Sequence, residues 1–380
     1  MGIKKHRVLF ISGFRKELLA LNGVVKKISL EIETFVKCGY TVDYVEFKGG
    51  KVFLNHNGKL DYLCDEGKTF YNTMHSVFKR LDSKCAVNYD LYYYRYEHFC
   101  FSMISFFRKS KEENKNLKIV GELPTFMKKW SPGSSFKTKL KFIVKRLLDN
   151  NFEKYIDYMV TFSDHEKIFG IKTIRIENFV DIEKVFVKKQ IDNNKIDLLA
   201  LAQITPSHGF DRVIKGMSFY INTQVSKPKI FLHVVGNGNH KQDLVELTNK
   251  LQLNEYVKFY GALGGEELDH IFDIADLGIG SLAFFRKGTS KGSELKVREY
   301  TARGLPFIYS AVEPQLRGVD FALKVPFDES DINIEDIEDF YNSLSHDSNL
   351  LSKMRDFAER EFTCKKQFDL ILSTVFDNEF

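Results

Sequence analysis

The sequence predicts an α/β protein of two domains, each built on a parallel β-sheet covered by helices on both faces. Short apolar runs alternate with segments of helical periodicity along almost the whole chain, which is typical of parallel sheets with crossover helices. The chain has 380 residues, enough for two cores of ordinary size. A polar segment, Glu183–Lys195, interrupts the alternation and is the candidate linker. We therefore expect domains at residues 1–182 and 195–362, with a last helical stretch at 363–380 that crosses back to the first domain.

The first half predicts strands of buried or alternating character, separated by helical stretches. The predicted strands are His6–Ser12, Thr41–Phe47, Tyr89–Tyr96, Leu117–Pro124, Tyr155–Ser163 and Lys172–Asn178. The predicted helices are Val24–Cys38, Thr73–Leu81, His98–Lys109 and Phe136–Leu148. Between them, Asn57-Gly58 lies inside an alternating run and predicts a β-hairpin, because this dipeptide suits tight primed turns.

The second half repeats the alternation after the polar segment. Its predicted strands are Ile196–Ala202, Lys229–Gly238, Val257–Gly261, Leu277–Ala283 and Pro306–Ser310. Its predicted helices are Phe210–Thr223, Gln242–Leu251, Glu266–Ala275 and the stretch between Lys291 and Gly304, followed by terminal helices that include Lys365–Phe376. Ligands of such sheets bind beyond the carboxyl ends of the strands, so we expect the site there.

The amino-acid composition and the cysteine spacing indicate in which compartment the protein is expected. The chain is 43% hydrophobic and 28% charged, which is typical of a globular protein rather than a disordered one. The N-terminal residues run directly into a strand-like segment without the pattern of a secretion signal. The five cysteines are scattered without paired spacing, which fits a reducing compartment. We therefore expect a cytoplasmic protein.

Two turns of the second half are candidate anion sites. His208, Gly209 and Arg212 follow its first strand, where a helix N-terminus and a guanidinium suit phosphate oxygens. The alternative is that Arg212 pairs with Asp211 or a surface acid. Gly236 follows the next strand in a Gly-Asn-Gly turn, which is equally typical of a tight turn without a ligand.

The first half offers three further candidates. Gly23 opens a helix after the first strand, where backbone amides can approach a phosphate, although a plain turn glycine is the more common reading. Glu122 ends a buried strand, and Arg95 ends the preceding one, so an ion pair is the alternative to a role in the site. Residues 127–148 carry seven Lys and Arg and no acid; such a basic amphipathic helix suits an anionic membrane surface or a solvated face.

Several enzyme classes lack their usual motifs. The sequence contains no D-x-D pair, G-x-S-x-G, H-E-x-x-H or phosphate-binding G-x-x-x-x-G-K-[ST]. Metal-acid sites, hydrolase triads, zinc proteases and phosphate-loop ATPases therefore lose their usual sequence support.

The second half resembles the donor domain of glycosyltransferase family 4, retaining enzymes with the GT-B fold of two Rossmann-like domains facing across a cleft. The resemblance rests on LLALAQITPSHGFDRVIKG, LHVVGNG, VKFYGALGGEELDHIFDIADLGIGSLA and KGSELKVREYTARGLPFIYS, in family order. The first half is similar more weakly through NGVVKKI, GELPTF and VTFSDHEKIFG. The local patterns HGFDR and KGSELKVREY are similar to those of bacterial capsular or exopolysaccharide transferases.

The resemblance implies roles for individual residues. Glu299 falls on the acid that holds the nucleotide ribose, and Lys291 falls on an acid that contacts the transferred sugar. That role is then in question at Lys291, and Glu294 is the candidate to take it over. The family's phosphate-binding Arg and Lys fall on Gln203 and His208.

With both replaced, Arg212 becomes the candidate for the diphosphate charge, assisted by His208. The family's sugar-side His falls near Glu122. The groups expected to contact the nucleotide are Glu299, Ser293, Leu295, Gly23, Gly236 and Gly209. No metal site and no resident cofactor are expected.

The expected activity is transfer of a sugar from a nucleoside-diphosphate sugar, with UDP as the expected nucleotide, to a polysaccharide or lipid-linked saccharide. Two alternatives stay open: a sugar-nucleotide epimerase of the same fold, and a catalytically degenerate partner subunit. Expected partners are the donor, the acceptor and an anionic membrane surface at residues 127–148, with the protein peripheral on the inner face of the membrane. No nucleic-acid partner is expected.

Overall fold

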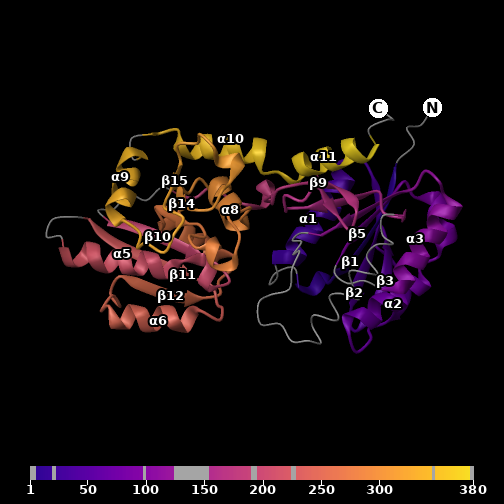
Figure 1. Ribbon diagram of the computed structural model, residues 1–380, viewed down its shortest axis with the longest axis horizontal. Helices are drawn as coiled ribbons and strands as arrows, with labels where there is room; N and C mark the ends of the chain where they lie inside the picture. Colours follow the sequence, from indigo (N-terminus) through magenta and orange to yellow (C-terminus); the bar gives the residue numbers. More distant parts are fainter. Residues whose placement is uncertain are drawn as a thin grey trace. The chain divides into compact units, whose positions relative to one another are not determined.

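The structure is a computed structural model, and it describes residues 6–18, 23–96, 100–123, 154–189, 195–223, 228–344 and 347–376. The chain divides into two compact units (Figure 1). One comprises Met1–Glu177 with Cys364–Phe380, and the other Asn178–Thr363. The chain thus passes from one unit to the other at residue 177 rather than after residue 182.

The first unit contains a sheet of nine strands among its described residues, in the order β4-β3-β2-β1-β5-β6-β7-β9-β8. The strands are β1 (Arg7–Phe14), β2 (Thr41–Lys48), β3 (Lys51–His56), β4 (Lys59–Asp65), β5 (Leu91–Arg95), β6 (Lys118–Glu122), β7 (Tyr158–Thr161), β8 (Lys167–Ile168) and β9 (Ile171–Arg175). The central strands are parallel, whereas β3, β4 and β8 pair antiparallel. The predicted hairpin is confirmed: Asn57 and Gly58 both have positive φ between β3 and β4.

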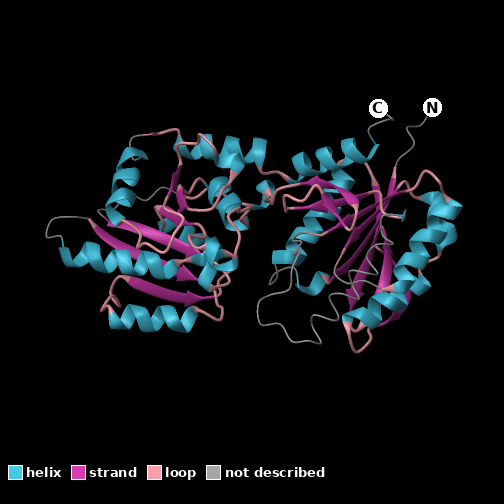
Figure 2. Cartoon of the chain, viewed as in Figure 1, coloured by secondary structure: helices cyan, strands magenta, loops and turns pink. Residues whose placement is uncertain are grey.

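Helices cover both faces of this sheet (Figure 2). Alternate residues of β1 face opposite sides. Leu9 and Ile11 join the core beneath α2 (Phe70–Arg80) and α3 (Phe101–Glu113). On the other side, Phe10 contacts Phe35 of α1 (Gly23–Lys37), and Phe35 contacts Phe368 of α11 (Cys364–Phe376). The predicted helix Phe136–Leu148 lies outside the described residues.

The second unit contains six parallel strands among its described residues, in the order β12-β11-β10-β13-β14-β15. They are β10 (Lys195–Leu201), β11 (Lys229–Val235), β12 (Val257–Gly261), β13 (Leu277–Ile279), β14 (Phe307–Tyr309) and β15 (Ala322–Lys324). The chain builds outward from β10 to β12, then returns and builds outward from β13 on the other side. The order of connection therefore reverses between β10 and β13, which is where Rossmann-type sheets bind ligands.

The helices of the second unit also form two layers. Residues from α5 (Phe210–Thr223), α6 (Lys241–Lys250) and α9 (Ile334–Leu344) pack into the core on one face. Residues from α7 (Glu266–Ile274), α8 (Leu295–Arg303) and α10 (Leu350–Glu361) pack on the other. In Figure 1, α5 and α6 run alongside β11 and β12.

The first part of the candidate linker packs on the second unit. The amide of Lys188 donates to the carbonyl of Arg303 at 2.8 Å. The guanidinium of Arg355 donates to the carbonyls of Ile182 and Val185, both at 2.7 Å. The polar composition of this segment therefore does not make it a free connector, because its backbone is bound to α8 and α10.

Candidate functional site in the second unit

The loops that follow β10 and β13 meet at the point where the strand order reverses. The amides of Leu282 and Ala283 donate to the carbonyls of His208 and Ser207, at 2.9 and 3.2 Å. This pairing joins the loop after β13 to the loop that leads into α5. Both loops lie at the carboxyl ends of their strands, so the candidate site is built by the two segments that the strand order predicts.

The N-terminus of α8 reaches the same place through Glu294, which is 9% exposed. Its carboxylate accepts hydrogen bonds from the Ser281 amide at 2.9 and 3.1 Å, and from the Ser281 hydroxyl. The amide of Glu294 donates to Glu313 Oε1 at 3.3 Å. Glu294 therefore ties the start of α8 to the end of β13. It positions the helix, and the prediction that it takes over a sugar contact is wrong because its carboxylate is buried and bound to Ser281.

Two lysines flank this carboxylate. Lys296, in the first turn of α8, is 9% exposed, and its Nζ lies 3.6 Å from Glu294 Oε2. Burial lowers the pKa of Lys296 to about 8, opposed by the charge of Glu294. Lys287 is exposed at the end of a short 3-10 helix (Phe284–Lys287), with its Nζ 3.7 Å from the centre of the Phe284 ring. Its charge lowers the pKa of Lys296 further.

Arg212 does not face the site. Its side chain is fully buried, and its guanidinium donates to the carbonyls of Ser330, Leu282 and Pro326. The prediction that Arg212 neutralises a diphosphate is therefore wrong, because three main-chain oxygens use its donors. The arginine instead ties the start of α5 to the loops that follow β13 and β15.

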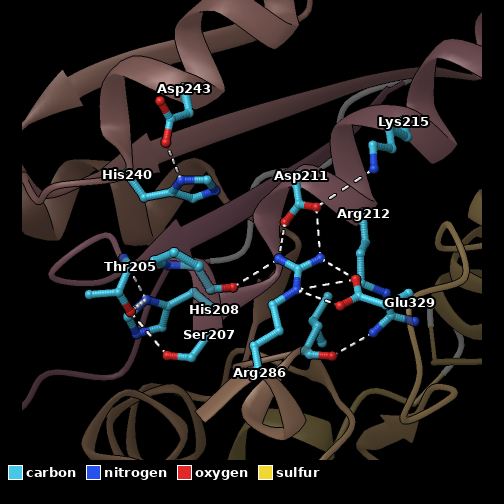
Figure 3. Close-up of polar contacts among 12 residues, drawn as sticks. Thr205, Ser207, His208, Asp211, Arg212, Lys215, His240, Asp243, Arg286 and Glu329 are labelled. Atoms are coloured by element: carbon cyan, nitrogen blue, oxygen red, sulfur yellow. Dashed lines mark hydrogen bonds and ion pairs between the residues drawn. The ribbon is translucent and has the colours of Figure 1, made fainter. Parts of the chain in front are cut away.

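The alternative given for Arg212 is confirmed for a surface acid but not for Asp211, because Nη2 of Arg212 lies 3.7 Å from Oδ1 of the exposed Asp328. Asp211 pairs with Arg286, whose Nη1 lies 2.7 Å from Asp211 Oδ1. Arg286 also contacts Glu329, with Nε at 3.0 Å from Oε1. Figure 3 shows the Arg286 guanidinium between these two carboxylates. Hydrogen bonds from Arg286 lower the pKa values of both acids.

His208 is electrically neutral at physiological pH. Its Nδ1 accepts from the Thr205 amide at 3.1 Å (Figure 3), and its ring stacks on Phe210. Burial lowers the pKa of His208 to about 3, and the charges of Lys296 and Lys287 lower it further. His208 therefore adds no positive charge for a phosphate, contrary to the prediction, although a neutral imidazole still offers one N–H donor.

The two candidate glycines have packing reasons for being glycine. Gly209 ends the short helix Pro206–His208 with φ +66°, and a Cβ there would lie 3.0 Å from Ala283 Cβ. Gly236 has φ +125°, and a Cβ would lie 1.8 Å from the carbonyl oxygen of Ala202. Both turns bring loops together at the carboxyl edge of the sheet, and contact with a nucleotide at either glycine stays a prediction.

The other predicted site residues around α8 differ in exposure and in their contacts within the protein. The Ser293 hydroxyl accepts from the Asn178 amide at 2.8 Å, so it is bound to main chain at the start of the unit. Leu295 and Lys291 are exposed, and Lys291 pairs with Val312 in an isolated bridge. Glu299 is partly exposed, and its Oε1 lies 3.1 Å from Arg303 Nη2. Glu299 and Lys291 thus keep a face toward solvent, and their roles stay predictions.

In the first unit, Glu122 is a buried ion-pair partner. Its Oε1 lies 3.1 Å from both Lys27 Nζ and Arg95 Nη1, which confirms the alternative given for it. The same cations lie 3.4 and 3.5 Å from the carboxylate of Glu31. Glu122 is fully buried, so the prediction that it acts on the substrate is wrong. Gly23 begins α1, and its contact with a phosphate stays a prediction.

Other expected features are partly outside the described residues. The basic segment 127–148 lies entirely outside them. Among the helices that the structure describes, none combines the length and apolar character that a membrane span requires. In the same residues, no group of three or more His, Cys, Asp or Glu side chains is arranged to hold a metal ion.

Lys296, Lys287 and Ser281 were not among the residues predicted from the sequence. A helical projection places Lys296 on the same side as Tyr300 and Arg303, at successive intervals of four and three residues, and all three are buried. That spacing is the one signal that pointed to an enclosed lysine. Nothing in the sequence shows that Ser281 meets Glu294, because the contact spans two elements.

Comparison with known proteins gives a family match within the second unit. Residues 181–361, just under half of the chain, match the family model described as Glycosyl transferases group 1. These residues are therefore similar to a glycosyltransferase group 1 domain. No curated protein sequence matches the chain significantly.

Solved structures support the fold over nearly the whole length. A glycosyltransferase from Rickettsia africae superimposes with TM-score 0.64 at 13% identity, covering 99% of this chain and 100% of that one. Sucrose-phosphate synthase from Thermosynechococcus elongatus gives 0.63 at 13%, covering 98% and 100%. Anabaena Alr3699/HepE in complex with UDP gives 0.57 at 16%, covering 97% and 100%. The predicted GT-B class, with two Rossmann-like domains, is confirmed.

Proposed function

We propose that this protein transfers a sugar from a nucleoside-diphosphate sugar, with UDP as the nucleotide, to a saccharide or lipid-linked acceptor. The observation that carries the proposal is the group 1 domain at residues 181–361, in which α8 begins beside the reversal of strand order. A helix N-terminus at this place suits an anionic ligand. Anabaena Alr3699/HepE, which shares the fold, was solved with UDP and with UDP-glucose.

The chemistry follows from the charge that develops during transfer. Breaking the bond between the sugar and the diphosphate leaves negative charge on the diphosphate and positive character on the sugar. Donors and positive charges held in place at the diphosphate stabilise that separation. In this chain, the first-turn amides of α8 and the adjacent lysines supply such charge, so the proposal needs no metal ion. Retention at the anomeric carbon is part of the proposal through the resemblance to family 4.

The proposal for the acceptor substrate has less specific support than the proposal for the donor. WaaB, described as a lipopolysaccharide outer core galactosyltransferase, and S. aureus TarM, solved with alpha-GlcNAc-glycerol and UDP, share the fold at TM-scores 0.55 and 0.51. We propose that the acceptor is a polysaccharide or a lipid-linked saccharide of the capsular type. We also propose that the protein acts in the cytoplasm at an anionic membrane surface, to which residues 127–148 bind. Binding to anionic liposomes that weakens with salt supports this location. Absent or salt-insensitive binding contradicts it.

The proposed activity is tested by a screen of UDP- and GDP-sugars that scores release of nucleoside diphosphate, with and without a lipid extract. Release that depends on the extract supports a transferase. Conversion of the sugar nucleotide without any acceptor indicates an epimerase instead. Absence of binding to every nucleotide sugar contradicts the proposal and favours a non-catalytic subunit.

A further inference from the structure

The ammonium group of Lys296 lacks a hydrogen-bond partner. The side chain is 9% exposed, and its Nζ is buried without a hydrogen bond. Its nearest carboxylate is that of Glu294 at 3.6 Å, which is already bound by the amide and hydroxyl of Ser281. On its other side, Nζ lies 5.0 Å from the centre of the Phe210 ring. Burying an ammonium group without hydrogen bonds raises the free energy of the folded protein. A ligand that accepts hydrogen bonds from Lys296 would remove that cost.

Counting the neighbouring charges gives an excess of positive charge. Lys296 and Lys287 share Glu294 as their acid. The next acid, Glu313, is bound by the buried guanidinium of Arg298, at 2.8 Å from Nη1 to Oε2. His208, whose pKa the charges of Lys296 and Lys287 lower, is neutral. Two ammonium groups therefore face one carboxylate, and the N-terminus of the nine-residue α8 adds its own positive potential.

We propose that Lys296, Lys287 and the first-turn amides of α8 form the anion site that takes the diphosphate of the donor. This inference rests on the proposed function and replaces Arg212 and His208 as the source of charge. Lys287 is exposed and meets the diphosphate at the rim of the site. Lys296 is in the first turn of α8 and is 9% exposed, so its charge is shielded little by water and acts over a short distance.

A second buried lysine provides a matched comparison. Lys188 is also 9% exposed. Two acids, Asp276 and Asp273, act on its charge and oppose the effect of burial on its pKa. Lys188 therefore has two acids acting on its charge, whereas Lys296 shares Glu294 with Lys287. Lys188 lies on the segment before β10. Burial alone does not distinguish the two lysines, but their partners do.

The experiment measures the affinities of UDP and uridine by calorimetry for the wild type and for the variants K296M, K296R, K287M and K188M. Uridine carries the base and ribose without phosphate, so the ratio of the two affinities reports the anion site. We expect K296M and K287M each to lower the ratio about tenfold or more, while K296R retains most of it and K188M stays within about twofold. Added salt should weaken the contribution of exposed Lys287 more than that of buried Lys296.

The pH dependence gives a readout that does not depend on any variant folding. Because the pKa of Lys296 is about 8, the wild-type preference for UDP over uridine should fall between pH 7.5 and 9.5 as that ammonium loses its proton. Glu294, at the N-cap of the same helix, and Lys287, on the short helix Phe284–Lys287, act on its charge, and neutral His208 does not titrate in this range. In K296M this fall should be absent or much smaller.

Two results overturn the inference. One is an unchanged ratio in folded K296M and K287M. The other is a wild-type ratio that stays flat from pH 7.5 to 9.5. Either result leaves the proposed function intact, since the wild type still binds UDP. If the wild type binds no nucleoside diphosphate at all, the proposed function fails first, and this inference fails with it.

Discussion

Nη1 of Arg298 lies 2.8 Å from Oε2 of Glu313, and neither side chain is more than 1% exposed. Nε and Nη2 of Arg298 also donate, to the carbonyl of Asn178 and to Gln315 Oε1 at 3.2 and 2.9 Å. Burial raises the pKa of Glu313, and the charge of Arg298 opposes that effect. This pair anchors the middle of α8 to the loop after β14, and so determines where the helix begins.

Breaking this pair should destabilise the protein strongly. Arg298→Met leaves the Glu313 carboxylate buried and unpaired, so we expect a loss of about 3–5 kcal/mol in the free energy of unfolding. The measurement is urea denaturation. The double variant R298M/E313Q should recover part of the loss, because both charges are then absent. A single-variant loss below about 1 kcal/mol would show that the pair is not enclosed in solution.

Arg212→Met should lower the stability of the protein, and it should not act by removing a charge that binds the diphosphate. The substitution leaves three carbonyl oxygens without their guanidinium donor, and each buried unsatisfied acceptor costs about 1–3 kcal/mol. We expect a clear fall in the midpoint of thermal unfolding. Arg317→Met is the control, because Arg317 is exposed, and it should stay within about 0.5 kcal/mol. Equal midpoints for the two variants would contradict the buried position of Arg212.

Gly236→Ala should be far more damaging than Gly264→Ala. A Cβ at Gly236 would lie 1.8 Å from the Ala202 carbonyl oxygen, whereas at Gly264 nothing lies within 4 Å. Both the clash and the positive φ at Gly236 oppose an added side chain. We expect Gly236→Ala to unfold at several degrees lower temperature or to accumulate as insoluble protein. Similar yields and unfolding midpoints would mean that the loop after β10 moves away at little cost.

Glu31→Gln should flatten the dependence of stability on pH. Burial and the charge of Glu122 raise the pKa of Glu31 from 4.5 to about 7. Between these values the folded state keeps a proton that the unfolded state loses, so the free energy of unfolding falls as pH rises. One proton gives a slope of at most about 1.4 kcal/mol per pH unit.

The test is chemical denaturation at several pH values between 5 and 8. Glu31→Gln should remove this slope, while Glu33→Gln, on the same helix α1, should retain it. Glu122 has the opposite tendency: its pKa is lowered through Lys27 and Arg95 against the effect of burial. Its contribution is therefore lost only on acidification below that range. A slope that survives in Glu31→Gln would assign the titration to another group.

Glu299→Gln should weaken recognition of the ribose. If the carboxylate binds ribose hydroxyls, a hydrogen bond to a charged group of about 1.5–3 kcal/mol is lost. The wild type should then prefer UDP over 2′-deoxy-UDP, and the variant should lose most of that preference. Asp269→Asn is the control, because Asp269 is the other acid paired with Arg303, at 2.7 Å. The same loss in Asp269→Asn would assign the effect to Arg303 and not to ribose contact.

Much of the fold was predictable because periodicity records burial. The side chains of Val8, Leu9, Phe10 and Ile11 point alternately to the two faces of the sheet. This pattern lies within one strand, so it is visible in the sequence. The hairpin at Asn57-Gly58 and the end of α8 at Gly304, with φ +74°, are likewise local, since positive φ favours asparagine and glycine. Resemblance added the expected class of enzyme, and the group 1 match over residues 181–361 agrees with it.

The candidate site was less predictable, because its charges are decided by contacts between distant segments. By itself the sequence determined that a cation, a glycine turn and a helix start follow the strands of the second half. It did not show that Arg212 donates to the carbonyls of residues 282, 326 and 330, or that Nζ of Lys296 lies 3.6 Å from Oε2 of Glu294. Only the tertiary structure decided those points. A charged side chain can bind a ligand only if the fold does not place main-chain acceptors or opposite charges beside it.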